Sequence, residues 1–192
     1  VPYYNKPPQE GLYQHFKAIA EATSLPCMLY NVPARTVVNL SADTVIRLSK
    51  IENIVAIKEA SSNLGQIARI IEETDDDFLV YSGNDNDLFP VLALGGYGVV
   101  SVASHIVGKQ LKQMIVDYIE NRPQQAAALH RKLLPLMDAL FVVSNPIPVK
   151  FALNHLGFYV GKPRLPLVEA DEIAKAVVID ALRNCTVDIP IP

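Results

Sequence analysis

The first hundred residues alternate between two patterns of apolar residues. Short, nearly continuous apolar runs indicate β-strands that are buried on both faces. Between them, apolar residues recur every three or four positions, which is the spacing of helices that cover a sheet. Strands are expected at 26–30, 53–58, 78–81 and 97–102, and helices at 9–23, 42–50, 63–73 and 87–94. This alternation predicts an α/β fold made of repeated βα units around a parallel sheet.

After Ser104 the sequence shows only the helical pattern. Helices are expected at 106–121, 123–140, 146–156 and 169–184. The chain should therefore divide into a strand-and-helix part at 1–103 and a helical part at 104–185, followed by a tail at 186–192.

Composition narrows the class of protein. Half of the 192 residues are apolar and 19% are charged, as in ordinary globular domains. A net charge of -3 and a pI near 5.8 give no basic surface for nucleic acid or for an anionic membrane. No apolar run is long enough to span a membrane, and no signal peptide is visible. Cys27 and Cys185 make no disulfide framework, which favours the cytoplasm. The four histidines are scattered along the chain, so no metal site is expected.

Two of the expected strands end in a reactive side chain, Tyr30 in the first and Lys58 in the second. A lysine at the end of a buried strand is costly unless its amine has a partner or a chemical role. The useful chemistry of a desolvated amine is Schiff-base formation with a carbonyl, and a nearby tyrosine can move the protons. Taken alone, Lys58 could instead pair with Glu59 or extend into water, and Tyr30 could be a packing residue.

Tyr30 and Lys58 belong to a longer set of motifs in a fixed order and spacing. This joint spacing favours the catalytic interpretation over the structural one. The set comprises Pro2–Pro7, Tyr30, Pro33, Thr36, Leu40, Ala56–Glu59, Ser82–Asp85, Gly95–Val102 and Asn145–Lys150. It resembles the pyruvate-dependent class I aldolases of the dihydrodipicolinate synthase and N-acetylneuraminate lyase family. The resemblance extends over nearly the whole chain, up to the residues before Thr186.

The resemblance implies a covalent mechanism without a separate cofactor. Lys58 would form an imine with pyruvate, and Tyr30 would shuttle protons. Tyr4 would complete the proton relay from a neighbouring subunit of a homo-oligomer. Arg35 would hold a carboxylate of the second substrate, L-aspartate 4-semialdehyde, or orient the loop. The product would be 4-hydroxy-tetrahydrodipicolinate, an intermediate of lysine (diaminopimelate) biosynthesis.

Three further residues receive roles from the resemblance. Gly83 and Val100 would line the pyruvate pocket, Gly83 because a side chain there would crowd the ligand. Tyr3 stands where family members build an inhibitory lysine site, whose other residues are not found in this chain. All the implied catalytic groups follow strand ends, as in (β/α)8 enzymes.

The same resemblance implies a partial TIM barrel, because a closed (β/α)8 barrel needs more strands than the four expected here. The chain would be a fragment containing about the second half of the barrel and the C-terminal helices. The family's Gly-Thr-Thr-Gly-Glu stretch, which binds the pyruvate carboxylate, is absent. We therefore expect the chain alone to be inactive or nearly so. Two alternatives remain: another pyruvate aldolase such as N-acetylneuraminate lyase, and a non-catalytic half-barrel that serves as an interaction module.

Overall fold

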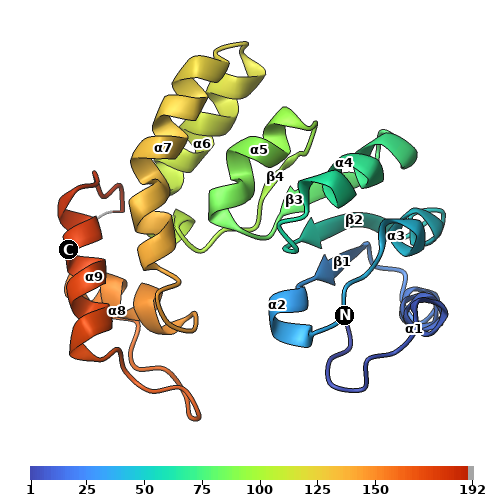
Figure 1. The fold of residues 1–192 in the computed structure, drawn as a ribbon, viewed down its shortest axis with the longest axis horizontal. Helices are drawn as coiled ribbons and strands as arrows, with labels where there is room; N and C mark the ends of the chain where they lie inside the picture. Colours follow the sequence, from blue (N-terminus) through green and yellow to red (C-terminus); the bar gives the residue numbers. More distant parts are fainter. Residues whose placement is uncertain (190–192) are drawn as a thin grey trace. The chain divides into compact units, whose positions relative to one another are not determined.

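The computed structural model describes residues 1–189, so the predicted tail at 186–192 lies partly outside the described residues. The chain forms two compact units, Val1–Val100 and a second unit from Ser101 onward. The first unit contains every strand of the described chain, and the second contains helices joined by loops (Figure 1).

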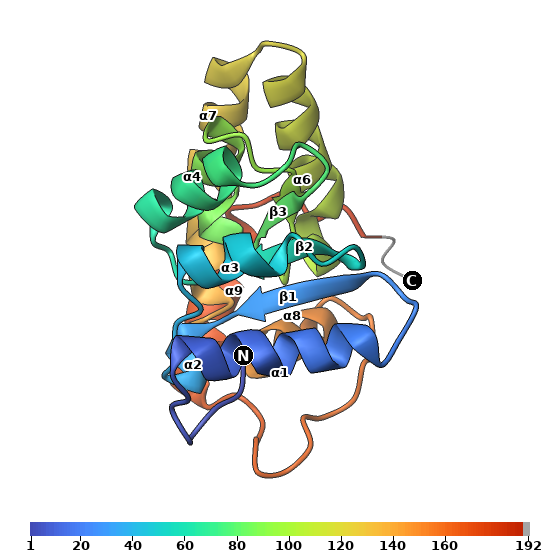
Figure 2. The ribbon, with the colours of Figure 1, turned by 90° about the vertical axis from the view of Figure 1, so that its right-hand side faces the viewer.

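The first unit is built on a parallel sheet, as the alternating pattern predicted. Its strands are β1 (Cys27–Asn31), β2 (Ile54–Glu59), β3 (Leu79–Ser82) and β4 (Gly98–Val99), and they lie side by side in chain order. The helices are α1 (Gln9–Glu21), α2 (Pro33–Thr36), α3 (Ala42–Leu48), α4 (Leu64–Glu73) and α5 (Leu88–Ala93), with a 3-10 turn at Asp85–Asp87. Helix α1 lies alongside β1, and α3, α4 and α5 follow along the sheet (Figures 1 and 2).

One local expectation was wrong. The strand expected at 97–102 is only two residues long, because β4 pairs with β3 through Gly98 and Val99 alone. Beyond it, the Ser101 hydroxyl accepts the Ser104 N–H at 2.8 Å, which starts a helix instead of extending the ladder. Between β1 and α3 the chain forms the short helix α2, with Pro33 at its first position. The helix expected at 87–94 is α5, which is one residue shorter at each end and follows directly after the 3-10 turn.

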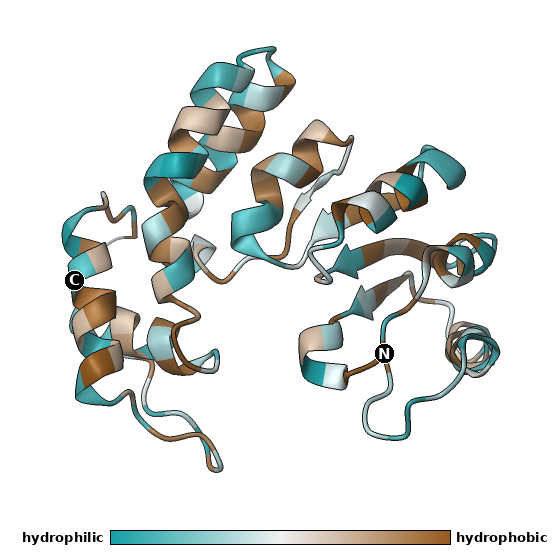
Figure 3. Ribbon diagram, viewed as in Figure 1, coloured by the Kyte–Doolittle hydropathy of each residue, from teal (hydrophilic) through white to brown (hydrophobic). Residues whose placement is uncertain are grey.

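The core of the first unit lies between the sheet and its helices. Leu29, Ile57 and Val80 are partners in neighbouring strands and are all buried, so they form an apolar row on the helix-covered face. The helices complete this cluster with Leu12, Leu48, Ile67 and Ile70. The body of the β2 ribbon is hydrophobic, whereas the arrowheads at the carboxyl ends of β1 and β2 are hydrophilic (Figure 3). The strands therefore carry apolar residues into the core and end in polar ones.

The central position of Ile57 gives a stability prediction. Its side chain is fully buried, so Ile57→Ala should lower the free energy of unfolding by about 2–5 kcal/mol through lost burial and a residual cavity. Val55 on the same strand is 37% exposed, so the control Val55→Ala should cost about 1 kcal/mol or less. Urea unfolding of the two variants measures both values. Equal losses would show that the row through Ile57 is not the centre of the core.

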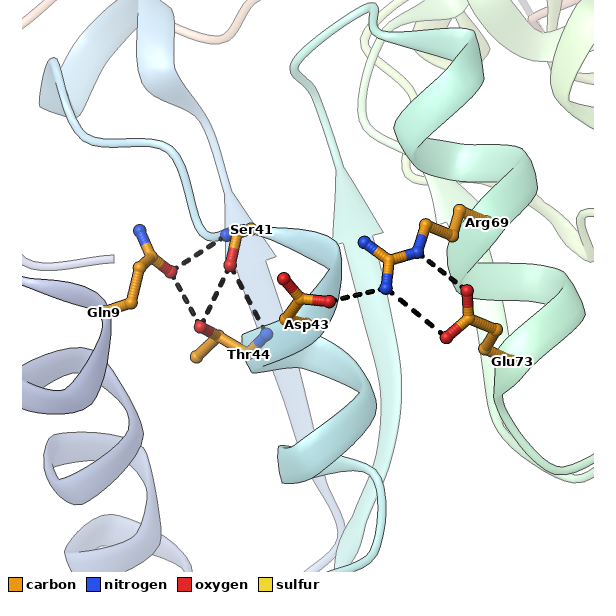
Figure 4. A network of polar contacts seen from close by, with 6 residues as sticks. All are labelled: Gln9, Ser41, Asp43, Thr44, Arg69 and Glu73. Atoms are coloured by element: carbon orange, nitrogen blue, oxygen red, sulfur yellow. Dashed lines mark hydrogen bonds and ion pairs between the residues drawn. The ribbon is translucent and has the colours of Figure 1, made fainter.

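Polar side chains tie the first three long helices together at the surface (Figure 4). The side-chain amide oxygen of Gln9 on α1 accepts the Thr44 hydroxyl at 2.8 Å and the Ser41 N–H at 3.1 Å, both at the start of α3. From the other side of α3, Asp43 accepts from Arg69 on α4, and Arg69 also pairs with Glu73 at 2.7 Å. Each of these helices is therefore fixed to its neighbour by side chains as well as by the core.

The second unit contains α6 (Ser104–Ile119), α7 (Pro123–Ala139), α8 (Ile147–His155) and α9 (Glu172–Arg183), which confirms the helical pattern with bounds that differ by up to three residues. Helix α7 packs against α6 and α9, and α8 packs against α9. Ile147, Ala170 and Ala174 form an apolar cluster with Phe151 and Leu167. Within residues 1–189, no helix is both long and apolar enough to cross a bilayer.

A carboxylate at the turn between α6 and α7 should make the free energy of unfolding depend on pH in the acidic range. Asp117 accepts hydrogen bonds from Arg122 at 2.6 Å and from Gln113 at 2.9 Å, and these donors lower its pKa below the usual 3.8. The carboxylate therefore contributes stability above the ordinary pKa, and the contribution is lost as pH falls through the lowered value. Urea unfolding at a series of acidic pH values should show a shallower loss of stability for Asp117→Asn than for the parent chain. Parallel curves would contradict this role.

Candidate functional site

A row of side chains crosses the sheet near the carboxyl ends of its strands. Tyr30 of β1 is the direct partner of Lys58 of β2, which is the partner of Tyr81 of β3, and Tyr81 in turn faces Gly98. Directly paired residues of parallel strands project from the same face, with the strands about 4.8 Å apart. Lys58 is therefore flanked by a tyrosine on each side.

The two residues singled out from the sequence are in contact. The Lys58 Nζ atom lies over the Tyr30 ring, 4.0 Å from its centroid. Such a contact favours a fixed position of the amine against the aromatic face. The structure thus brings together an amine and a phenol that are 28 positions apart in the sequence.

The alternative explanation of Lys58 as an ion-pair partner of Glu59 does not hold. Among the residues that the structure describes, no ion pair joins them. The reason is the pleat of the strand, which sends successive side chains to opposite faces. The expected desolvation of the amine is only partial, since Lys58 is half-buried and Tyr30 is 36% exposed.

Gly83 and Val100 follow the neighbouring strand ends of β3 and β4. The Gly83 N–H donates to the Glu59 carbonyl at 2.7 Å, and the Val100 N–H donates to the Ser82 carbonyl at 2.9 Å. A Cβ atom at Gly83 would lie 2.6 Å from the Cβ of Ala60. Packing against Ala60 therefore favours glycine at this position, and the place of Gly83 in a pyruvate pocket stays a prediction. Val100 is 40% exposed at the same edge.

The remaining predicted residues lie in the segments around the sheet. Arg35 is in the last turn of α2, five positions after Tyr30, and its side chain is exposed. Tyr3 and Tyr4 precede α1 and are 74% and 82% exposed. Tyr4 adopts a left-handed backbone conformation with φ of 69°, which is uncommon for a bulky residue. The described contacts do not bring Tyr3 or Tyr4 to Lys58.

Sequence reasoning missed Tyr81. Its ring is half-buried, its centroid lies 5.2 Å from that of Tyr97, and burial raises the pKa of the phenol. Aligning the ends of the expected strands would have placed Tyr81 beside Lys58, because parallel strands of βα units end at one edge.

A buried polar cluster lies behind the row, on the helix-covered face. The Glu59 carboxylate is 1% exposed and accepts the Asn31 side-chain amide at 3.0 and 3.1 Å. It also accepts the Gln66 side-chain amide at 3.1 Å and the Ser61 N–H at 2.7 Å. Asn31 in turn accepts the Leu40 N–H at 2.9 Å. This cluster joins the ends of β1 and β2 to the start of α4.

The arrangement suits amine chemistry on the open face of the sheet. A lysine amine that attacks a carbonyl needs a neighbouring group to carry protons, and Tyr30 supplies a hydroxyl beside it. Within residues 1–189, no group of three or more histidine, cysteine, aspartate or glutamate side chains is arranged to hold a metal ion.

Comparison with known proteins supports the family resemblance found in the sequence. A family model described as the dihydrodipicolinate synthetase family matches residues 1–185. The 4-hydroxy-tetrahydrodipicolinate synthase of Dehalococcoides mccartyi is 61% identical over 191 residues, which are 100% of this chain and 64% of that protein. The enzyme of the same name from Listeria welshimeri is 56% identical over 88% of this chain and 58% of its own length. The chain thus spans less than two-thirds of these relatives.

Solved structures agree with the fold. The crystal structure of the synthase from Cyanidioschyzon merolae with lysine bound superposes with a TM-score of 0.94 at 49% identity, and covers 96% of this chain and 63% of that one. The Thermotoga maritima dihydrodipicolinate synthase gives 0.92 at 46% identity, over 95% and 63%. From the family match, these identities and the row of strand-end residues, we conclude that the chain belongs to the dihydrodipicolinate synthetase family.

Proposed function

We propose that this chain carries the Schiff-base lysine of a 4-hydroxy-tetrahydrodipicolinate synthase, which condenses pyruvate with L-aspartate 4-semialdehyde. The observation that supports it most directly is the Lys58 amine held 4.0 Å from the centre of the Tyr30 ring at the carboxyl edge of the sheet. The names of the Dehalococcoides and Listeria relatives support the same reaction. The reaction needs no separate cofactor, and we assign it to the cytoplasm.

The proposed chemistry begins with the unprotonated amine of Lys58. Its nitrogen adds to the ketone carbon of pyruvate, and loss of water leaves a protonated imine. Loss of a proton from the pyruvate methyl group gives an enamine, whose carbon attacks the aldehyde of the second substrate. Tyr30 donates and accepts the protons of these steps. Arg35 binds a carboxylate of the aldehyde substrate through its planar fork of donors, while Gly83 and Val100 border the pyruvate.

We further propose that the chain supplies about the second half of a (β/α)8 barrel together with the C-terminal helices. Four parallel strands and a coverage of 64% of the Dehalococcoides relative support this assignment. In the whole protein, a homo-oligomer would bring Tyr4 to the site of a neighbouring subunit. The exposure of Tyr4 and its left-handed backbone fit a residue that is held for contact with another chain. Tyr3 would belong to a lysine-binding site between subunits.

Trapping of the imine tests the proposal. The chain is incubated with pyruvate, reduced with borohydride and digested, and the adduct is located by peptide mass spectrometry. A complemented chain is treated in the same way; it is this sequence joined to the segment of the Dehalococcoides synthase that the chain does not match. We expect a pyruvyl adduct on Lys58 in the complemented chain and a weaker one in the chain alone. Labelling of other lysines to the same extent as Lys58 would overturn the assignment.

The two alternatives are separated by activity. A lyase of the N-acetylneuraminate type would cleave sialic acid, whereas the synthase would consume aspartate semialdehyde. Arg35 favours the synthase, because its substrate offers a carboxylate to a guanidinium group. A non-catalytic interaction module would show no adduct on Lys58 in either form of the chain.

A further inference from the structure

The structure contains a buried carboxylate that the proposed chemistry does not use. Glu59 is adjacent to Lys58 in the sequence, yet it is 1% exposed on the opposite, helix-covered face of the sheet. Within residues 1–189 it forms no ion pair, so hydrogen bonds alone compensate its charge. Burying a carboxylate in this way is expensive, and a neutral side chain would fill the same space at lower cost. We therefore looked for a role that only a carboxylate at Glu59 could fill.

The donors to Glu59 come from three different segments. Asn31 is the last residue of β1, Ser61 lies in the loop after β2, and Gln66 is in the first turn of α4. A single carboxylate therefore fixes the ends of two neighbouring strands and the helix that follows them. Charge-assisted hydrogen bonds are shorter and stronger than neutral ones, which suits a fixed junction.

The junction extends to the loop after α2. The Asn31 side chain accepts the Leu40 N–H at 2.9 Å and donates to Asn39 at 2.8 Å. The Asn39 amide donates to Gln66 at 2.9 Å. Asn31 is therefore held in one orientation by partners on both sides, and its neighbour Tyr30 is held with it.

We propose that Glu59 is a positioning residue that sets the distance between the Lys58 amine and the Tyr30 ring from behind the sheet. Because side chains alternate along a strand, fixing Asn31 and Glu59 on the covered face fixes Tyr30 and Lys58 on the open face. The chemical consequence rests on the proposed function, but the geometric claim does not. A displacement of about 1 Å at a reacting group can cost roughly 10²-fold in rate.

The test removes the negative charge of the Glu59 side chain and keeps its size and shape. Glu59→Gln presents one acceptor oxygen and an amide that donates, so it meets three donors with too few acceptors. In the double variant Glu59→Gln with Gln66→Glu, the charge returns to the cluster on the other side of the same contact. Glu72→Gln, an exposed position on α4, removes one negative charge elsewhere and serves as the matched control.

The first readout needs no pyruvate. In the parent chain the Lys58 ε-methylene protons should resonate upfield, because the amine lies over the Tyr30 ring; Lys58→Met identifies the signal. We expect the shift to collapse in Glu59→Gln, to return largely in the double variant and to stay unchanged in Glu72→Gln. An unchanged shift in folded Glu59→Gln, or no upfield shift in the parent chain, would overturn the proposal. If Glu59→Gln does not fold, Gln66→Met removes one donor and is judged by the same shift.

The second readout is the rate at which the Lys58 imine is trapped in the complemented chain. We expect Glu59→Gln to lower this rate roughly 10- to 100-fold and the double variant to recover most of it. A parent chain with the upfield signal but no adduct would refute the proposed function and leave the positioning role supported. An adduct that forms at the parent rate in Glu59→Gln would refute the positioning role and leave the proposed function intact.

Discussion

Replacing Lys58 with methionine in the complemented chain is expected to abolish the pyruvyl adduct and the condensation. Methionine is close to lysine in length and keeps an apolar side chain over the Tyr30 ring, but it has no amine to attack the ketone. Removal of the nucleophile from a covalent enzyme costs as much as roughly 10⁶-fold, so we expect a loss of at least about 10³-fold. Borohydride trapping and the rate of pyruvate consumption measure the two effects.

A matched lysine separates this effect from a general one. Lys50 pairs with Asp75 at 2.8 Å at an exposed position, and Lys50→Met should leave both rates near those of the parent. Chemical rescue sharpens the result: Lys58→Cys treated with bromoethylamine regains an amine at nearly the lysine position, whereas Lys58→Met given the same treatment does not. Undiminished condensation by Lys58→Met would exclude the Schiff-base mechanism.

The Tyr30 hydroxyl should account for the second large effect. Tyr30→Phe keeps the ring beneath the Lys58 amine and removes only the group that moves protons. General acid–base groups contribute about 10²–10⁴-fold, so we expect a loss of that size in the rate of imine trapping. Single-turnover trapping of the imine with borohydride measures this loss.

Two further variants separate the effect of the Tyr30 hydroxyl from the effect of losing any tyrosine hydroxyl and from the effect of the Tyr30 ring. Tyr13 supports the Arg47 guanidinium at 4.0 Å in a similar cation–ring contact on α1, and Tyr13→Phe should have no effect on trapping. Tyr30→Leu removes both ring and hydroxyl, so a further loss beyond Tyr30→Phe measures the contribution of the ring contact. If Tyr30→Phe and Tyr30→Leu trap pyruvate as fast as the parent chain, the proton carrier is another group, and Tyr81 is the nearest candidate along the sheet.

The sequence alone was sufficient for the kind of fold and for selecting Tyr30 and Lys58, which the structure places in contact and whose chemical roles stay a proposal. Alternating apolar runs identified the parallel strands, because strands buried on both faces leave a strong pattern. Tyr30 and Lys58 stood out because each ends such a run. The length of β4 could not be read in this way, since Val100 and Val102 continue the apolar pattern while the hydrogen-bonded ladder has already ended.

Other features depend on contacts between segments that the sequence does not reveal. The spacing of Glu59 and Gln66 carries no sign that both side chains meet Asn31, because the register of β1 and β2 decides it. Tyr81 is different, because aligning the ends of the expected strands would have placed it beside Lys58. Glu59 was considered only as a partner of Lys58, although the period of two along a strand places adjacent residues on opposite faces.

The close packing at Gly83 has a practical consequence for redesign of substrate range. Any side chain at this position would have to displace Ala60, whose Cβ would be 2.6 Å away, and would disturb the hydrogen bond from Gly83 to the Glu59 carbonyl. A mutant library that varies Gly83 would therefore select mainly for chains that still fold. Val100, at the end of the neighbouring strand and 40% exposed, should tolerate changes of size, and is the better position at which to reshape the proposed pyruvate pocket.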